Sequence, residues 1–394
     1  MAKIAVIGGG AAGMLAAGRA AQRGHEVHLF EKNNRLGKKI LITGKGRCNV
    51  TNDGDLDAFL DNIPGNPYFM YSAFYRFDNQ ALRQLLLDMG LETKVERGNR
   101  VFPVTDRSLD VVQALEKYMR QNKVALHLES QVEHVVMKEG KVTGIRLKNQ
   151  KELPFDAVIV TTGGLSYPNT GSTGDGYRMA KAAGHTVTKL YPSLVPLKTA
   201  ESWCQELMGL SLRNIAIRIC NEKGKTVYED FGEMLFTHFG ISGPVVLSAS
   251  SYIGRYQGKE LKFIIDLKPA LNKEQLDHRV LKDFNKTLNK DFVNSLDHLL
   301  PKKLIPVMIG LSDISPEKKV NEISREERKA FGSLIKELPM TVTGTRSFAE
   351  AIITQEFVDL KKRSLHKAEL TSKRSIRGRW NQRRSKDYIL QGKY

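Results

Sequence analysis

The sequence predicts an α/β fold in which a parallel sheet is followed by a β-rich segment and then by a helical one. The first thirty residues alternate an apolar strand, a glycine-rich turn, an alanine-rich helix and a second strand. Short runs with β-type alternation occupy residues 185–269, and apolar residues at helical spacing follow from 272 to 338. At roughly 150 residues per domain, the 394 residues allow two or three domains.

The N-terminal elements are defined by local signals. The apolar run from Lys3 to Ile7 is typical of a buried parallel strand. A helix is predicted from Met14 to Arg23, because Gly24 provides a C-terminal cap. The second strand is predicted over residues 27–30. A strand, a helix and a second strand in this order indicate the start of a doubly wound sheet.

The next elements are a helix and four strands. Ser108 is a candidate N-cap for a helix with apolar residues at positions 111, 112, 115 and 119. Strands are predicted over 124–128, 132–137, 142–147 and 157–161. The last run is apolar throughout, which favours a central strand, and it ends at the pair Gly163-Gly164.

Residues 185–269 predict a small β-barrel or sandwich, with a hairpin-like turn at residues 221–224. Two capping boxes then mark helix starts, Asn272 with Gln275 and Ser324 with Glu327. An apolar stripe at 276, 280, 284 and 288 follows the first box. Pro339 is expected to end the second helix, after which residues 341–353 would return the chain to the first domain.

The glycine turn carries the chemical signal. Gly8-x-Gly10-x-x-Gly13 lies between a strand and a helix, and Glu31 ends the second strand 18 residues after Gly13. Gly8 allows the tight turn, Gly10 lets a pyrophosphate approach the backbone, and Gly13 lets the helix pack on the strand. The Glu31 carboxylate can accept hydrogen bonds from a ribose diol and would repel a 2′-phosphate. The pattern therefore favours FAD or NAD over NADP.

Residues 32–52 favour FAD over NAD. This segment contains five basic side chains besides Lys32 and four asparagines, and a second pair of glycines stands at Gly44 and Gly46. The glycines let the backbone come close to a large anionic ligand. A dinucleotide with a tricyclic head needs such an extended second cradle, whereas a solvated basic loop does not need this pattern.

The segment from Gly37 to Asn52 closely resembles the signature of the BaiN-like bacterial flavoproteins, three-domain FAD-dependent oxidoreductases that include aminoacetone oxidase. Further matching blocks are residues 100–104, 161–176, 235–244, 343–344 and 349–355. The resemblance covers residues 1 to about 355. It implies a Rossmann-like FAD-binding domain with an inserted β-barrel domain and a small helical domain. The corresponding boundaries are 1–188 for the first part of the FAD domain, 189–270 for the barrel, 271–338 for the helices and 339–355 for the return to the barrel and FAD domains.

The resemblance also implies which residues hold FAD. Carried over by position, they are Gly8, Gly10, Ala11, Ala12 and Gly13 of the first turn, Glu31, Lys32, Lys39 and Arg47, the backbone of Val132 near the adenine, and Thr162 with Gly163. The implied reaction is hydride transfer between the flavin and a small organic substrate, an amine or a conjugated enone. The redox partner would be O₂ or NAD(P)H. Neither the oligomeric state nor the direction of transfer follows from the sequence.

The end of the chain departs from the family pattern. In the family, a Gly-Gly pair follows the position of Gln355, and a later glycine-rich helix start closes over the flavin. This sequence continues with Glu356-Phe357 and has no glycine-rich equivalent. We therefore hypothesise a truncated or frame-altered C-terminus. The alternative function is a catalytically impaired flavin- or nucleotide-binding protein with a basic tail able to bind nucleic acid.

Charge and composition limit the partners. The net charge is +18, and residues 356–394 contribute +8 of it, with twelve Lys or Arg and four Asp or Glu. For this tail we favour a disordered basic end over an RNA-binding arm, so we expect no nucleic-acid partner. No apolar run approaches the roughly 18 residues of a membrane helix. With three cysteines and no export signal, we expect a cytoplasmic protein.

The sequence assigns no catalytic residue and no metal ligand set, because a flavin supplies the redox chemistry. Cys48 beside Arg47 could act in redox work, but the absence of a C-x-x-C argues against a dithiol–disulfide reductase. We favour a structural Cys48, because a free cysteine usually behaves as a small buried hydrophobic residue. His238 can orient substrate, donate a proton or be structural. Tyr167 can wall the flavin or pack against Pro168.

Overall fold

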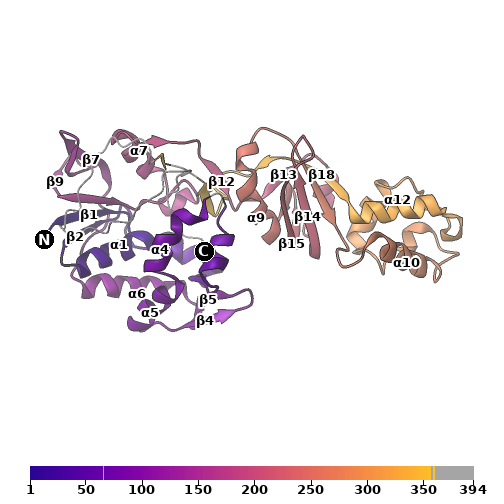
Figure 1. Cartoon of the computed structure of the whole chain (residues 1–394), viewed down its shortest axis with the longest axis horizontal. Helices are drawn as coiled ribbons and strands as arrows, with labels where there is room; N and C mark the ends of the chain where they lie inside the picture. Colours follow the sequence, from indigo (N-terminus) through magenta and orange to yellow (C-terminus); the bar gives the residue numbers. More distant parts are fainter. Residues whose placement is uncertain (65, 356–357, 360–394) are drawn as a thin grey trace. The chain divides into compact units, whose positions relative to one another are not determined.

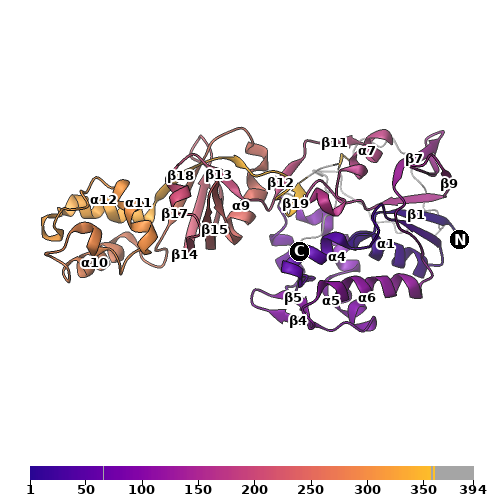
Figure 2. The same cartoon turned by 180° about the vertical axis from the view of Figure 1, so that it is seen from behind.

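The computed structural model describes residues 1–64, 66–355 and 358–359, so the expectation for the basic tail lies outside the described residues apart from Val358 and Asp359. The chain divides into two compact units. Unit 1 contains Met1–Tyr191 and the described residues from Ile353 onward, and unit 2 contains Pro192–Ile352. Figure 1 and Figure 2 show the two units from opposite sides.

Unit 1 is built on a parallel sheet with strand order β10-β1-β2-β6. Its strands are β1 (Lys3–Ile7), β2 (Glu26–Phe30), β6 (Ala125–His127) and β10 (Ala157–Val160). Helices α1 (Ala11–Gln22) and α6 (Ser108–Gln121) cover one face, and Ile4, Val6 and Leu29 pack against them. A second sheet covers the other face over Ala5 and Ile7. It contains β7 (Val132–Lys138), β8 (Lys141–Leu147) and β9 (Glu152–Pro154).

The remaining elements of unit 1 lie between or after the parallel strands in the sequence. Helical segments after β2 are α2 (Lys38–Ile42), η1 (Thr43–Gly46), α3 (Leu56–Asp61), η2 (Pro67–Met70), α4 (Tyr71–Arg76) and α5 (Asn79–Asp88). A small sheet in the order β3-β5-β4 joins Thr51–Asn52, Arg100–Pro103 and Thr93–Glu96. After β10 come η3 (Pro168–Thr170), α7 (Asp175–Ala182) and β11 (Thr186–Val187), which pairs with β20 (Val358–Asp359). Strands β12 (Tyr191–Ser193) and β19 (Ile353–Gln355) lie where the chain passes between the units.

Unit 2 contains a closed barrel in the order β13-β16-β15-β14-β17-β18. Its strands are Leu197–Thr199, Gly240–Ser242, Thr226–Thr237, Ser211–Cys220, Leu261–Asp266 and Leu338–Thr345, in that order. Its helical segments are α8 (Trp203–Glu206), α9 (Pro244–Ile253), η4 (Gly254–Tyr256), α10 (Lys273–Phe284), η5 (Phe292–Ser295), η6 (Lys302–Leu304), α11 (Ile305–Gly310), η7 (Val320–Glu322) and α12 (Arg325–Lys336). The inserted barrel is confirmed.

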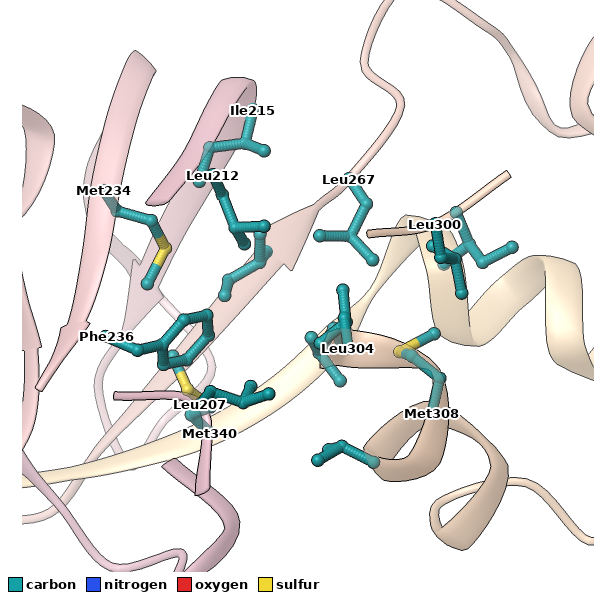
Figure 3. Packing of buried hydrophobic residues seen from close by; sticks show 14 of the residues in the cluster. Leu207, Leu212, Ile215, Met234, Phe236, Leu267, Leu300, Leu304, Met308 and Met340 are labelled. Carbon is teal, nitrogen blue, oxygen red and sulfur yellow. The ribbon is translucent and has the colours of Figure 1, made fainter. Parts of the chain in front are cut away.

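One hydrophobic cluster joins the barrel of unit 2 to its helical part. Barrel side chains such as Met234 and Phe236 lie in the same cluster as Leu300, Leu304 and Met308 of the helical segments. Figure 3 shows these two groups of side chains facing one another. The barrel and helices of unit 2 therefore share a single core.

Both capping boxes are present. The Asn272 side chain accepts a hydrogen bond from the backbone N–H of Gln275, and the Gln275 side chain accepts one from the backbone N–H of Asn272. Ser324 and Glu327 exchange the same two bonds. The apolar stripe of the first helix ends early, because α10 stops at Phe284 and Leu288 is exposed beyond it.

Two further expectations were wrong. Ser108 is not the N-cap of α6, because its hydroxyl donates instead to the carbonyl oxygen of Leu41 at 3.0 Å. β10 is not central among the described strands, where it pairs only with β1 at the edge of the sheet. An apolar run indicates that a strand is covered on both faces of the sheet, but it does not show whether one or two strands pair with it.

Candidate functional site

The first glycine turn is shaped by close backbone packing. Gly8 has φ +105°, and a Cβ there would lie 2.5 Å from the carbonyl oxygen of Thr161 at the end of β10. A Cβ on Gly13 would overlap the carbonyl oxygen of Gly8. Only glycine lets the turn, the helix and the neighbouring strand approach this closely.

Gly10 has a different environment. A Cβ on it would meet no atom within 4 Å, so the residue faces open space. Gly10 is also the N-cap of α1, with no side-chain capping bond and no acidic residue in the first turn. The N–H groups of Ala11 and Ala12 thus stand at the positive end of a twelve-residue helix. This arrangement fits a pyrophosphate group.

The carboxylate of Glu31 joins the glycine turn to the end of β2. Glu31 is 7% exposed. One of its oxygens accepts the Gly9 N–H at 2.7 Å, and the other accepts the backbone N–H of Asn33 at 2.8 Å and its Nδ2 at 2.6 Å. Three donors therefore orient the side chain beside the turn. A carboxylate has about four acceptor positions, which leaves capacity for a ribose hydroxyl.

Lys32 is tied to the second glycine-rich segment. Its ammonium donates to the Thr173 hydroxyl at 2.6 Å and to Asp175 at 2.7 Å, and Arg178 pairs with the same carboxylate. Burial alone would raise the pKa of Asp175, but hydrogen bonds and charge from Lys32 and Arg178 hold it below its ordinary value. The loops after β2 and β10 are joined by this ion pair.

Lys39 lies in α2 and reaches the same second segment. Its ammonium donates to the hydroxyl of Ser166 at 3.1 Å, and no carboxylate pairs with it in the described part of the chain. Burial lowers the pKa of Lys39. Ser166 is fully buried, and its N–H, like that of Leu165, donates to the hydroxyl of Thr354 in β19. Lys39 is thus a half-buried cation able to neutralise an anionic ligand.

Arg47 anchors the second pair of glycines. Its guanidinium pairs with Glu96 and Asp106, and it lies 4.2 Å over the ring of Phe102. Its hydrogen bonds lower the pKa of Glu96, and those of Lys94 and Arg47 lower the pKa of Asp106. Any contact between Arg47 and a cofactor would therefore share the guanidinium with two carboxylates.

Cys48 lies next to Arg47 in a left-handed conformation with φ +61°. It is 1% exposed, and burial raises the pKa of its thiol. A reactive cysteine needs exposure and a lowered pKa, so these features support the structural role.

The other predicted cofactor residues lie near the same strand ends. Val132 begins β7 and is buried, with its backbone paired to Leu147. Thr162 and Gly163 follow β10, and Gly163 has φ +72°, where a Cβ would lie 2.7 Å from the Ser172 hydroxyl. Tyr167 also has a left-handed backbone, with φ +51°. The contacts of these residues with a cofactor stay predictions.

His238 belongs to unit 2. It lies in the two-residue turn between β15 and β16, is exposed, and has its ring 4.8 Å from that of Phe239. The guanidinium of Arg346 lies 4.4 Å over the ring of Phe239 and pairs with Glu350. A role in catalysis or in structure stays open for His238.

The sequence did not single out several residues that complete these arrangements. Asn33, Ser166, Asp175 and Thr354 all hold site residues in place. Each lies inside or beside a matching block, but single positions there carry no signal of their partners.

The glycine turn, the uncapped helix and the parallel strands define a Rossmann-type α/β protein. A family model described as the HI0933-like protein Rossmann domain matches residues 2–370. The chain therefore belongs to the HI0933-like Rossmann family. This membership, together with the relatives below, confirms the resemblance to the BaiN-like flavoprotein oxidoreductases.

Several curated relatives match most of the chain. A 3-dehydro-bile acid delta(4,6)-reductase of Clostridium scindens is 33% identical over 360 residues, covering 89% of this chain and 85% of the relative. A ribosomal RNA dihydrouridine synthase of Haemophilus influenzae is 31% identical over 360 residues, covering 90% and 86%. The solved 3-ketosteroid-delta4-(5alpha)-dehydrogenase of Rhodococcus jostii RHA1 aligns over 91% of this chain and 84% of its own, at 14% identity and a TM-score of 0.43. In the part of the chain that the structure describes, no helix is both long and apolar enough to cross a membrane.

Proposed function

We propose that this protein is an FAD-dependent oxidoreductase that transfers hydride between the flavin and a carbon–carbon double bond conjugated to a carbonyl group. The supporting observation is the first glycine turn. Open space at Gly10, an uncapped helix behind it and the oriented Glu31 carboxylate beside it match the needs of a dinucleotide.

In this proposal, the chain's residues bind and orient the cofactor. The N–H groups of Ala11, Ala12 and Gly13 receive the pyrophosphate, and Glu31 receives the ribose hydroxyls. Lys39 offers charge that no carboxylate among the described residues neutralises. When bound, FAD supplies the hydride acceptor or donor.

The names of the relatives support reduction of a double bond over oxidation of an amine. One relative is a delta(4,6)-reductase, and the other forms dihydrouridine. In a 3-keto-4-ene steroid and in uracil, the double bond that is reduced is conjugated to a carbonyl. Reduction adds a hydride and a proton, and NAD(P)H is the proposed source of the hydride.

Spectroscopy of the full chain tests this function. Protein purified with FAD should show flavin absorbance, which anaerobic NADH or NADPH should bleach. Addition of a 3-keto-4-ene steroid or of a uridine-containing rRNA fragment should then restore it, and the two additions distinguish the substrate classes. An amine that bleaches the flavin, with hydrogen peroxide forming under air, would favour the oxidase direction and contradict the proposal.

A second candidate is a flavin-binding protein without turnover. It is supported by residues 356–394, whose sequence departs from the family pattern after Gln355. FAD absorbance that neither NADH, NADPH nor an amine bleaches would favour this candidate.

A further inference from the structure

Residues 51–82 differ sharply in composition from the rest of the chain. They contain five aspartates and one basic residue, Arg76, in a chain of net charge +18. Seven of these 32 residues are aromatic, against 8% of the whole chain. The segment includes α3, η2 and α4 of unit 1.

The aromatic side chains of this segment are largely exposed. Tyr68, Tyr71, Tyr75 and Phe77 have 72%, 47%, 79% and 43% of their surfaces accessible, and we call these four residues the tyrosine surface. The rings of Tyr71 and Tyr75 stack with centroids 6.4 Å apart and planes 10° apart. Exposed aromatic groups of this density mark binding surfaces, because tyrosine offers both apolar area and a polar hydroxyl.

The neighbouring helix α3 also carries exposed carboxylates. Phe59 of α3 packs against Phe74 of α4 at 5.4 Å, which holds the two helices together. Asp57 and Asp61, one helical turn apart on α3, are exposed, and neither forms an ion pair in the described ranges. Aromatic faces and free carboxylates together recognise Lys and Arg side chains. They repel nucleic acid.

A cationic partner is present in the same polypeptide. Residues 360–394 contain twelve Lys or Arg and two acidic residues. They follow β20, which pairs with β11 inside unit 1. Thirty-five residues can span up to about 115 Å when fully extended, which exceeds the dimensions of a unit of this size. The segment is therefore long enough to reach the tyrosine surface, and its positive charge is opposite to that of Asp57 and Asp61.

We propose that the tyrosine surface, with Asp57 and Asp61, binds the basic segment 360–394 of the same chain. Lys and Arg side chains of the segment stack on Tyr71 and Tyr75 and pair with the two carboxylates. This contact is independent of the proposed redox function, since none of its residues belongs to the glycine turn or to the Glu31 site.

Limited trypsin digestion of the full chain tests the contact, because trypsin cleaves after Lys and Arg. We expect cleavage within residues 361–393 to be about fivefold faster in Y71S/Y75S and in D57N/D61N than in the parent. The control E92Q/E260Q changes two exposed carboxylates outside the segment and should leave the rate unchanged. Circular dichroism checks that each variant is folded. Equal rates in the parent and both folded variants would overturn the proposal.

Carbodiimide cross-linking identifies the occupant directly. The parent chain should give links between Asp57 or Asp61 and lysines of the segment, and 0.5 M salt should reduce them. A mixture of isotope-labelled and unlabelled protein should give links only within single copies. Links between labelled and unlabelled copies, or no links to Asp57 and Asp61, would overturn the assignment to the same chain.

Discussion

Glu31 serves the site through the hydrogen bonds that it accepts. Both of its oxygens face N–H donors, one from Gly9 and two from Asn33. In the variant E31Q, the amide nitrogen has to face one of these donors, so a buried hydrogen bond is lost. We expect the free energy of unfolding without FAD to fall by about 1–3 kcal/mol.

Urea denaturation of E31Q and of the exposed control E92Q measures this difference. FAD binding should also weaken in E31Q and not in E92Q. Equal stability of the parent and E31Q would show that the Glu31 hydrogen bonds do not hold the glycine turn.

Asp175 gives the site a dependence on pH. Its folded-state pKa is lowered, so its contribution to stability is present above the unfolded pKa of about 3.9 and is lost as pH falls through the folded value. The variant D175N removes the carboxylate from Lys32 and Arg178. We expect it to be about 1–3 kcal/mol less stable than the parent at pH 7, and the difference should shrink as pH falls below the ordinary pKa of a carboxyl group.

Denaturation of D175N across pH 2–8 measures this, with the exposed D297N of unit 2 as the control. Equal stability of the parent and D175N at pH 7 would contradict a stabilising ion pair.

At the scale of elements, we expect substitution of Gly13 to reduce stability and substitution of Gly10 to reduce cofactor affinity. In G13A, the added methyl overlaps the Gly8 carbonyl, and we expect a loss of roughly 1–3 kcal/mol or more in stability. In G10A, the methyl meets no atom, and the backbone at φ −82° suits alanine, so stability should be unchanged. The methyl would occupy the space assigned to the pyrophosphate, so FAD affinity should fall.

Thermal unfolding and FAD titration of the two variants test this contrast. A G10A protein that binds FAD as tightly as the parent would place the pyrophosphate elsewhere.

Local elements were predictable from the sequence, and their partners were not. The strand–turn–helix at residues 3–22 and both capping boxes depend on residues within a few positions of one another, and all three are present. The bonds from Lys39 to Ser166 and from Leu165 to Thr354 join residues 127 and 189 positions apart. The apolar pattern of β10 likewise contains no information about its edge position.

Arg47 illustrates the same limit at a predicted site residue. Its position in a glycine-rich basic loop predicted a cofactor contact, while its carboxylate partners lie on or after β4 and β5, 49 and 59 positions later. A family motif predicts that a residue has a function, but only the folded structure shows which residues it contacts.

At the scale of the whole molecule, each unit has its own hydrophobic core. The clusters around the parallel sheet contain only residues of unit 1, and the barrel and helical cluster contains only residues of unit 2. Calorimetry should therefore resolve two unfolding transitions. Since FAD is proposed to bind unit 1, a concentration of 100 times its Kd should stabilise that transition by about 2.7 kcal/mol and leave the other unchanged.

The variant L304A assigns the transitions. Leu304 is fully buried in the core of unit 2, so truncation to alanine should cost about 2–5 kcal/mol in that transition alone. FAD should then still shift the unaffected transition by the parental amount. If L304A and FAD instead shift the same single transition, the two cores unfold as one cooperative unit. A cofactor bound at the glycine turn would then stabilise the barrel against unfolding as well.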